Sequence, residues 1–212
     1  MNKTVDLVNK WGEYEATHPK ATIDEFCRFY ITNTREKQKK NKVLDGNIPP
    51  DDYSTMAKMV GRLSKLHATY ALIGLKECGL NSLDEFLYLN SIGNLIKPRK
   101  TEVINNNFNE LSSGLLILGR LKNKGLIHEE ENIEDKRSKR LTLSKKGNAI
   151  LKECYKNMAL INEKFFGDIP KDDVKLCTQL LSSLEAEFAS RWVADKGKSF
   201  VVIINKLSKK PL

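Results

Sequence analysis

The stretch RLKNKGLIHEEENIEDKRSKRLTLSKKG, residues 120–147, decides the fold, because it places a run of basic residues between two short alternating apolar runs. The runs LIHEE and KRLTL show the period of two that is typical of strands with one buried face. They predict a β-hairpin with a long polar loop that carries Lys136, Arg137, Lys139 and Arg140. Repulsion among these charges is tolerable if an anionic partner completes the tip, and the alternative interpretation is an ordinary solvated loop.

Two short helices are expected directly before this hairpin. The first runs from about Thr101 to Phe108, the residues NELSS form a turn, and the second runs from Ser112 to Lys124, where Gly125 ends it. Two helices joined by a tight turn and followed by a hairpin form a winged helix-turn-helix. In this motif the second helix enters the major groove of duplex DNA, and the hairpin reaches along the backbone toward the minor groove. The sequence therefore favours DNA binding.

Long amphipathic helices flank the predicted winged helix-turn-helix. One is expected from about Asp52 to Cys78 and another from Ser144 to Gly167, followed by a final helix after Pro170. Their apolar residues alternate spacings of three and four, which suits packing along another long helix. Such surplus apolar faces indicate self-association, and the alternative is that they pack only within one chain. The predicted fold class is mainly α (α+β), a winged helix-turn-helix with long flanking dimerisation helices and an extra N-terminal helical segment.

The chain is expected to have five segments. They are an N-terminal helical extension and linker (1–50), a dimerisation helix with a short helix (51–93), the winged helix-turn-helix (94–147), C-terminal dimerisation helices (148–192) and a basic, apolar tail (193–212). Within the extension, Thr22 and Glu25 form a capping box that predicts the start of its second helix. In the tail, SFVVIIN is a short apolar run with high β propensity, which either pairs as a strand or docks elsewhere, or lies loose.

The composition bounds the possible partners. The chain of 212 residues has a net charge of +9, which favours a polyanionic partner. From Lys97 to Lys146 there are twelve Lys or Arg against seven Asp or Glu, a net charge of +5 within the predicted winged helix-turn-helix. No stretch approaches the roughly 18 apolar residues that span a membrane, and the N-terminus has no apolar core of signal-peptide length. We therefore expect a cytoplasmic protein that does not contact membranes.

Nothing in the sequence indicates a metal, a cofactor or an active site. The four cysteines and three histidines lack the spacing of metal ligands, and there is no nucleophile–base pair or phosphate-binding glycine loop. We therefore expect neither a cofactor nor enzymatic activity. Reduced cysteines packed in the core are the simplest interpretation. A redox role is the alternative for Cys78, which ends a long helix near the expected dimer interface.

Residues 120–147 resemble the signature of the MarR-type (multiple antibiotic resistance regulator) winged-helix transcription factors. The shared motifs are Arg-Leu at 120–121, Gly-Leu-Ile at 125–127, Asp-Lys-Arg at 135–137, Leu-Ser at 143–144 and the glycine at 147. The similarity extends over roughly residues 53–191. The resemblance implies a homodimer clasped by its long helices, two wings spaced for a pseudo-palindromic DNA operator, and control by a small aromatic or phenolic ligand.

The resemblance also implies roles for individual residues. Asp135 would orient Arg137 through an ion pair, and Arg137 would touch the DNA backbone or the minor groove. Lys136 and Lys139 would contact phosphates. The complete set of expected DNA-binding residues is Ser112, Ser113, Leu115, Leu116, Arg120, Asp135, Lys136, Arg137, Lys139 and Arg140.

The second helix departs from the family pattern. Leu115 and Leu116 occupy the positions of a threonine and an arginine, and a leucine contacts a thymine methyl group but cannot hydrogen-bond to guanine. Gly114 and Gly119 each weaken the helix by roughly 1 kcal/mol relative to alanine. The preceding NNNFN run, residues 105–109, could cap, turn or reach bases. These departures support an alternative, a divergent winged-helix module whose leucines dock a protein instead of DNA.

Overall fold

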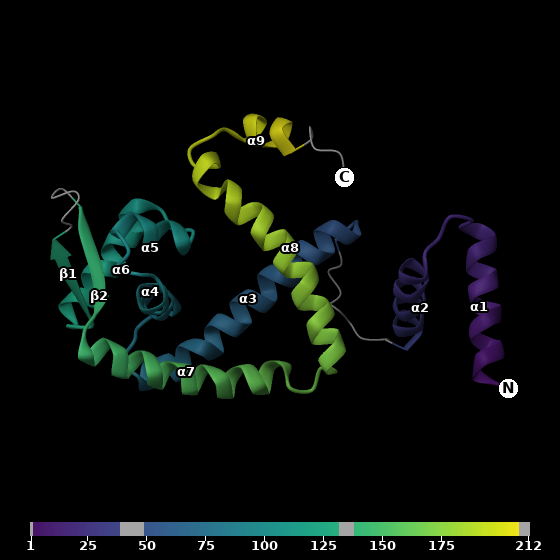
Figure 1. Cartoon of the computed structure of the whole chain (residues 1–212), viewed down its shortest axis with the longest axis horizontal. Coiled ribbons are helices and arrows are strands. Elements are labelled where there is room, and N and C mark those ends of the chain that lie inside the picture. The colour runs from purple at the N-terminus through teal and green to yellow at the C-terminus, as the bar shows by residue number, and fades with distance from the viewer. Residues whose placement is uncertain (1, 39–48, 132–137, 208–212) are drawn as a thin grey trace. The chain divides into compact units, whose positions relative to one another are not determined.

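The computed structural model describes residues 2–38, 49–131 and 138–207 of the chain (Figure 1). The chain divides into two compact units, Met1–Val60 and Gly61–Leu212. The described residues form helices and one two-stranded sheet, which confirms the predicted mainly α class. Most of the predicted polar linker falls on residues 39–48, outside the described part of the chain.

The first unit contains α1 (Lys3–Thr17), α2 (Ile23–Gln38) and the start of α3 (Asp52–Glu77). The second unit contains the rest of α3 and the elements that follow it. These are α4 (Leu83–Asn94), α5 (Lys100–Asn106), α6 (Leu111–Asn123), β1 (Ile127–Glu131), β2 (Lys139–Leu143), α7 (Lys145–Phe166), α8 (Lys171–Asp195) and α9 (Phe200–Leu207). The predicted order of two short helices, a hairpin and two long helices is confirmed.

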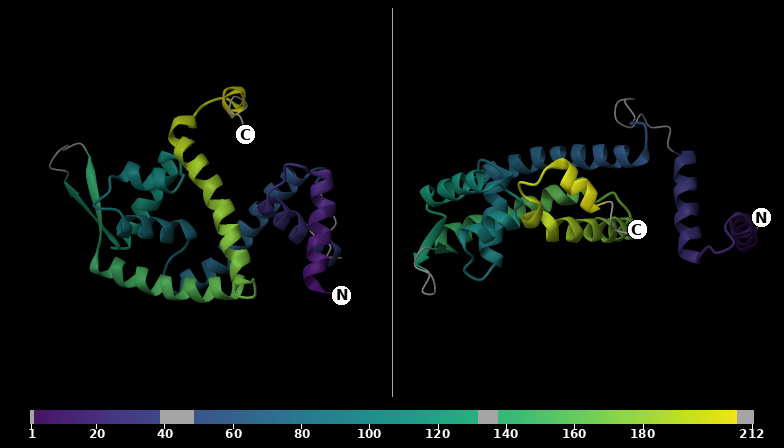
Figure 2. Two further views of the ribbon diagram at one scale, coloured as in Figure 1. Left: turned by 45° about the vertical axis from the view of Figure 1, so that its right-hand side comes forward. Right: turned by 90° about the horizontal axis from the view of Figure 1, so that it is seen from above.

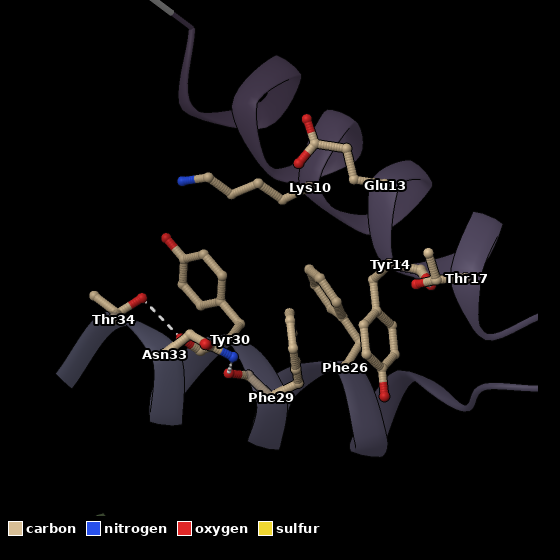
Figure 3. Close-up of a pocket in the computed structure, with 9 residues that line it drawn as sticks. All are labelled: Lys10, Glu13, Tyr14, Thr17, Phe26, Phe29, Tyr30, Asn33 and Thr34. Carbon is tan, nitrogen blue, oxygen red and sulfur yellow. Dashed lines mark hydrogen bonds between the residues drawn. The ribbon is translucent and has the colours of Figure 1, made fainter. Parts of the chain in front are cut away.

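The N-terminal helices α1 and α2 pack through a small cluster of aromatic rings (Figure 3). Phe26 is 5% exposed and lies edge-on against Trp11, with 5.2 Å between ring centroids, and Tyr14 lies 4.6 Å from Phe29. Aliphatic side chains of these two helices are largely exposed, among them Val5, Leu7, Val8, Ile23 and Ile31. The two helices also line an open pocket of about 510 Å³ beside the rings, shown in Figure 3.

Helix ends lie where the sequence predicts caps. At the start of α2, Glu25 N donates to Thr22 Oγ1, and Thr22 N donates to the Glu25 carboxylate, which confirms the capping box. Gly79 follows α3 and Gly125 follows α6, with φ angles of +78° and +69°. Glycine adopts this left-handed conformation at no steric cost, so both helices can end in a tight turn.

The core of the second unit is built around α4. Tyr88 and Leu89 of α4 are fully buried, as are Leu121 of α6 and Leu141 of β2. Helix α4 packs against α5, α6, α7 and β2. In Figure 1 and in both views of Figure 2, α5, α6 and the hairpin lie beside α4, and α7 leads away from the hairpin.

Helices α3 and α7 lie close together in this unit. Asn157 Nδ2 donates to Gly74 O at 2.9 Å, and His67 Nε2 lies 2.9 Å from Asn162 Oδ1. A Cβ atom on Gly74 would lie 2.8 Å from Ile161 Cδ1, so the glycine permits this close approach. The two long helices therefore pack against each other beside the winged helix-turn-helix.

The junction between the hairpin and α7 depends on Ser144 and Gly147. Ser144 Oγ accepts a hydrogen bond from Gly147 N at 2.9 Å and donates one to Gly125 O at 2.7 Å. One hydroxyl group thus caps α7 and ties it to the end of α6. A Cβ atom on Gly147 would collide with the carbonyl oxygen of Leu126. Any larger residue at 147 would push α7 away from the hairpin, which explains the serine and the glycine of the motif.

The asparagine run forms a hydrogen-bonded turn between α5 and α6. The side-chain amides of Asn106 and Asn107 both donate to Ser91 Oγ, at 3.0 and 2.9 Å. The amide of Asn109 donates to the hydroxyl oxygen of Tyr88 at 3.1 Å. Because Ser91 and Tyr88 belong to α4, these bonds hold the turn against the core. Of the three uses that the sequence leaves open for this run, the turn is the one observed.

The packing of α6 depends on Gly114. A Cβ atom there would lie 2.5 Å from Ile104 Cγ1 and 2.7 Å from the Tyr88 hydroxyl oxygen, distances that real Cβ atoms essentially never show. A Cβ atom on Gly119, in the same helix, would meet no heavy atom within 4 Å. The sequence treats both glycines alike as weak points of the helix, but only Gly114 has a packing reason.

The C-terminal tail differs from expectation. Residues 200–207 form helix α9, so the strand-like interpretation of SFVVIIN is wrong. A β-prone run forms a strand only where a neighbouring strand can pair with it. Instead, Lys206 Nζ lies 2.7 Å from Asp195 Oδ1, and Lys198 Nζ lies 3.3 Å from the same atom. These ion pairs tie the tail to the end of α8.

Replacing Gly114 by alanine is expected to lower the free energy of unfolding by about 1–3 kcal/mol, because the added methyl group overpacks the contact with Ile104 and Tyr88. Gly119→Ala is the matched control and should raise the free energy of unfolding by up to about 1 kcal/mol, since it gains helix propensity in open space. Urea unfolding followed by circular dichroism measures both values. Equal shifts in the same direction would show that the close approach has no energetic consequence.

Candidate nucleic-acid interface

Helix α6 buries one face and presents the other to solvent. Its buried residues are Gly114, Ile117, Leu118 and Leu121. Ser112 and Ser113 of the first turn are exposed, and Leu115 and Leu116 are 43% and 67% exposed. The four residues predicted to read bases are therefore all accessible. Two of these four residues, Leu115 and Leu116, are apolar.

Basic residues near the end of α6 pair with a buried carboxylate. Glu85 of α4 is fully buried, and its Oε2 accepts from Lys124 Nζ at 2.7 Å and from Asn81 N at 2.8 Å. Arg120 Nε lies 3.4 Å from Oε1 of the same carboxylate. A buried carboxylate is stable only with such partners. Arg120, predicted as a DNA contact, thus also neutralises a charge inside the protein.

On the face of the hairpin that is turned toward the core, the side chains change from apolar to charged along the strands. Strands β1 and β2 are antiparallel, and Ile127 pairs with Leu143 and Glu129 with Leu141. Because side chains alternate along a strand, these residues share one face, called the inner face here, and Lys139 extends it toward the tip. Ile127 and Leu141 are buried, whereas the Glu129 side chain is 11% exposed. Glu129 is therefore the first charged residue beyond the apolar base of the inner face.

Three lysines surround this glutamate. Carboxylate oxygens of Glu129 lie 2.8 Å from Lys100 Nζ, 3.1 Å from Lys122 Nζ and 3.6 Å from Lys139 Nζ. The lysines come from α5, α6 and β2, so three elements converge on one carboxylate. Hydrogen bonds from Lys100 and then Lys122 lower the pKa of Glu129 to about 2, although burial opposes this shift. These four residues, the Glu129 cluster, carry a net charge of +2 at neutral pH.

The opposite, outer face of the hairpin holds a separate set of interactions. Lys97 Nζ lies 2.8 Å from Glu130 Oε2, and this hydrogen bond lowers the pKa of Glu130. Arg140 Nη1 donates to Lys97 O at 3.2 Å and lies 3.8 Å from Glu102 Oε2. Lys139 and Arg140 are adjacent in sequence but point to opposite faces, so only Lys139 joins the Glu129 cluster.

The structure brings part of the predicted site together. Residues 112, 113, 115 and 116 are exposed together on α6, and Lys139 lies on the inner face of the hairpin. Asp135, Lys136 and Arg137 lie outside the described residues, so their roles stay predictions.

Sequence reasoning missed Lys100, Lys122 and Glu129. A signal existed for two of them, since Lys122 follows Leu115 by seven residues, nearly two helical turns, and Glu129 follows Ile127 by two residues on a strand. No local pattern could have placed Lys100, because its position depends on how α5 packs against the hairpin.

The cysteines occupy two kinds of environment. Cys78 is buried beside Cys154. Burial, and to a smaller extent the neighbouring Cys78, raises the pKa of the Cys154 thiol to about 12. A sensing thiol needs an exposed, electropositive setting, and this buried pair has the opposite one. Cys27 and Cys177 are exposed, so the expectation that all four cysteines pack in the core is wrong.

A cavity of about 620 Å³ opens between α3 and α7. It is lined by Tyr70, Leu160, Ile161, Lys164 and Phe165. Its wall is apolar apart from the Tyr70 hydroxyl group and the Lys164 ammonium group. Such a surface suits an apolar ligand that carries a negative charge.

Among the described residues, no three or more His, Cys, Asp or Glu side chains are grouped so that they could hold a metal ion. Within the same ranges, no helix is both long enough and apolar enough to cross a membrane.

No protein-family model and no curated protein matches the chain, but many solved structures share its fold. The transcriptional regulator SlyA matches 66% of this chain and 99% of its own, with 16% identity and a TM-score of 0.61. A mutant of MarR from E. coli, complexed with operator DNA, matches 61% of this chain and 92% of its own, with 19% identity and a TM-score of 0.57. CouR from Rhodococcus jostii RHA1, bound to p-coumaroyl-CoA, matches 64% of this chain and 91% of its own, with 16% identity and a TM-score of 0.55.

These similarities confirm the MarR-type winged-helix fold that residues 120–147 predict. Helices α1 and α2 lie outside the matched region, which confirms that the N-terminal helices are an addition to this fold.

Glu129 is expected to make stability depend on pH. Its folded-state pKa of about 2 lies below the ordinary value of 4.5, so its contribution is complete above about pH 4.5 and is lost as the pH falls toward 2. Between pH 5 and pH 3, the free energy of unfolding should fall less in Glu129→Gln than in the wild type, by about 1–3 kcal/mol. Urea unfolding at the two pH values measures this loss. Glu130→Gln, which has one lysine partner among the described residues where Glu129 has three, should change this loss less. Identical pH dependence in wild type and Glu129→Gln would contradict the prediction.

Proposed function

We propose that this chain is a homodimeric, DNA-binding transcriptional regulator of MarR type that is controlled by a small ligand. The observation that carries the proposal is the exposed face of α6, which sits beside a basic hairpin in the MarR-type fold. Its other face is buried against the core, so α6 is held rigidly with residues 112, 113, 115 and 116 outward. A helix presented in this way can enter the major groove.

The distribution of charge supports DNA as the partner. The segment from Lys97 to Lys146 has a net charge of +5, and its described lysines include Lys122 and Lys139, which are about half exposed. Lysine and arginine side chains supply most of the affinity of a protein for duplex DNA through the phosphates. Among similar folds, the mutant MarR from E. coli is itself complexed with operator DNA.

Unpartnered apolar faces support a homodimer. None of the residues of α8, all of which the structure describes, is buried. Its exposed apolar side chains are Val174, Leu176, Leu180, Leu181, Leu184, Phe188 and Val193. On α3, Leu63, Leu66, Tyr70 and Ile73 are also exposed at spacings of three and four. A 25-residue helix without a buried face is stabilised by packing against another surface. A second copy of the chain offers the same pair of faces.

The cavity between α3 and α7 supports control by a small ligand. Its rings, Tyr70 and Phe165, could hold an aromatic ligand, and Lys164 could pair with a carboxylate. CouR, which shares the fold, is bound to p-coumaroyl-CoA. A ligand shifts an equilibrium only if it binds one state more tightly than another, and a site beside the dimerising helices would couple occupancy to the spacing of the wings.

A second function, docking of a protein, is favoured by one observation. Leu111, Leu115 and Leu116 are 52%, 43% and 67% exposed, so three leucines lie on the face that would read bases. Exposed apolar groups of this kind mark protein interfaces more often than DNA contacts. The two functions predict different effects of salt, since docking through leucines would depend little on ionic strength.

DNA binding is expected to weaken steeply with salt, with a log–log slope near −0.9 for each phosphate neutralised. Arg137→Ala should weaken binding to all duplexes alike and make the slope shallower by about 1, as loss of a backbone contact does. Fluorescence anisotropy of the full chain with labelled duplexes at several salt concentrations measures both. Lys171→Ala is the control, because it also removes one positive charge. Lys171 is the first residue of α8, and α7, which is about 33 Å long, separates it from the hairpin.

The same assay separates the two functions. If duplex binding were undetectable at low salt while Leu115→Asp abolished binding to a protein partner, the docking module would replace the regulator.

The homodimer is expected to dissociate when charge is placed on the apolar face of α8. Leu180→Glu with Leu184→Glu should convert the protein to a monomer at micromolar concentration, because two carboxylates would be buried without partners. Ser182→Glu is the control, since Ser182 is two residues from each leucine and therefore lies on another side of the helix. Sedimentation equilibrium measures the mass. A wild-type protein that is already monomeric would rule out the proposed dimer.

A further inference from the structure

Lys122 and Lys139 lie on the two elements that would contact DNA, α6 and the hairpin. Lys122 follows Leu115 by seven residues, so its side chain leaves α6 on the same accessible face. Lys139 is the first residue of β2 and lies on the inner face of the hairpin. Both ammonium groups reach the carboxylate of Glu129, at 3.1 and 3.6 Å. The Glu129 cluster therefore lies where the exposed face of α6 meets the inner face of the hairpin.

The three lysines are not equivalent partners of the carboxylate. Lys100 is the closest, at 2.8 Å, and its side chain is 32% exposed. Lys122 and Lys139 are more distant, and their side chains are 52% and 54% exposed. Ion pairs with this much exposure contribute only about 0–1 kcal/mol each. Lys100 alone can keep Glu129 neutralised, so the two outer ammonium groups can exchange the carboxylate for another anion at little cost.

We propose that Lys122 and Lys139 form a binding site for one backbone phosphate of DNA, and that Glu129 is the resident counter-ion that holds this site occupied in the free protein. The inference rests on the proposed DNA-binding function and assigns a phosphate contact to Lys122 and a regulating role to Glu129 and Lys100. Lys100 acts as a positioning residue, because it neutralises Glu129 and so releases the other two lysines.

This arrangement lowers the affinity for arbitrary DNA. Three lysines without a carboxylate would attract any phosphate, since the attraction is independent of sequence. With Glu129 present, a phosphate must compete for Lys122 and Lys139, which lowers the affinity for all duplexes equally, so that stable binding also requires the base contacts of α6. The cluster keeps its net charge of +2, so it still attracts the backbone.

The first test compares two neighbouring glutamates. Glu129→Gln should raise affinity roughly fivefold at 0.15 M salt, for every duplex alike, and should keep a log–log slope close to that of the wild type, because the same single phosphate is bound without a competing carboxylate. Glu130→Gln makes the same change of charge on the outer face, where Lys97 is its ion-pair partner among the described residues, and should raise the affinity less. Fluorescence anisotropy of the full-length proteins measures the affinity and the slope of all three.

The second test uses the lysines. Lys122→Ala should make the slope shallower by about 0.9, because a phosphate contact is lost. Lys100→Ala should also weaken binding, since Glu129 then holds Lys122 and Lys139 more tightly. In the double variant Lys100→Ala with Glu129→Gln, this effect should vanish, because the carboxylate that causes it is gone. Such non-additivity is the signature of residues that act through one another.

The outcomes are distinguishable. If the wild-type chain binds duplexes but Glu129→Gln gains no more affinity than Glu130→Gln, or binds more weakly than wild type, the inference is overturned and the proposed function stands. If the effect of Lys100→Ala persists in the double variant, Lys100 touches phosphate itself and its positioning role is wrong. If neither wild type nor Glu129→Gln binds a duplex at low salt, the proposed function and the inference both fail. Lys122→Ala changes an exposed side chain, so it tests the inference even if Glu129→Gln fails to fold.

Discussion

The close approach of α6 to α4 and α5 at Gly114 is the constraint on which the candidate interface depends. With no Cβ at this position, the helix backbone lies directly against Ile104 and the Tyr88 hydroxyl group. That contact fixes the rotation of α6 about its axis, so Ile117, Leu118 and Leu121 face inward. The accessible face, with Leu115 and Lys122, follows from the same rotation. Tyr88 also accepts the hydrogen bond of Asn109, so one side chain positions both the helix and the turn before it.

A second close approach fixes the hairpin relative to α6. Ser144 bonds to the end of α6 through Gly125 O, and Gly147 lets α7 pass the Leu126 carbonyl group. The hairpin starts and ends at this junction, so its inner face has little freedom to turn. Glu129 consequently meets Lys122 of α6 at 3.1 Å. The two tight contacts are built by glycines, and the charged cluster is their consequence.

Much of this fold was predictable because local signals agree with tertiary packing. Hydrophobic periodicity, the Thr22–Glu25 capping box and the glycines after α3 and α6 are local features, and they predict helix order correctly. The tail was mispredicted because a short apolar run such as SFVVIIN fits a strand or a helix, and only its surroundings decide. The packing role of Gly114 could not be predicted for a related reason. The sequence gives the low helix propensity of glycine but does not show which side chains lie against this residue. Lys100 likewise reaches Glu129 only through packing.

The positive charge of the winged helix-turn-helix is less available than its sum suggests. Two carboxylates hold five of its basic residues, Glu85 with Arg120 and Lys124, and Glu129 with Lys100, Lys122 and Lys139. Burial separates their roles. Glu85 is fully buried, so removing its partners would leave an uncompensated charge in the core, and that pairing belongs to the fold. Glu129 lies at the rim of the core with two half-exposed partners, so its pairing can exchange with an incoming anion. Depth therefore distinguishes the carboxylate whose pairing belongs to the fold from the one whose lysine partners stay half exposed.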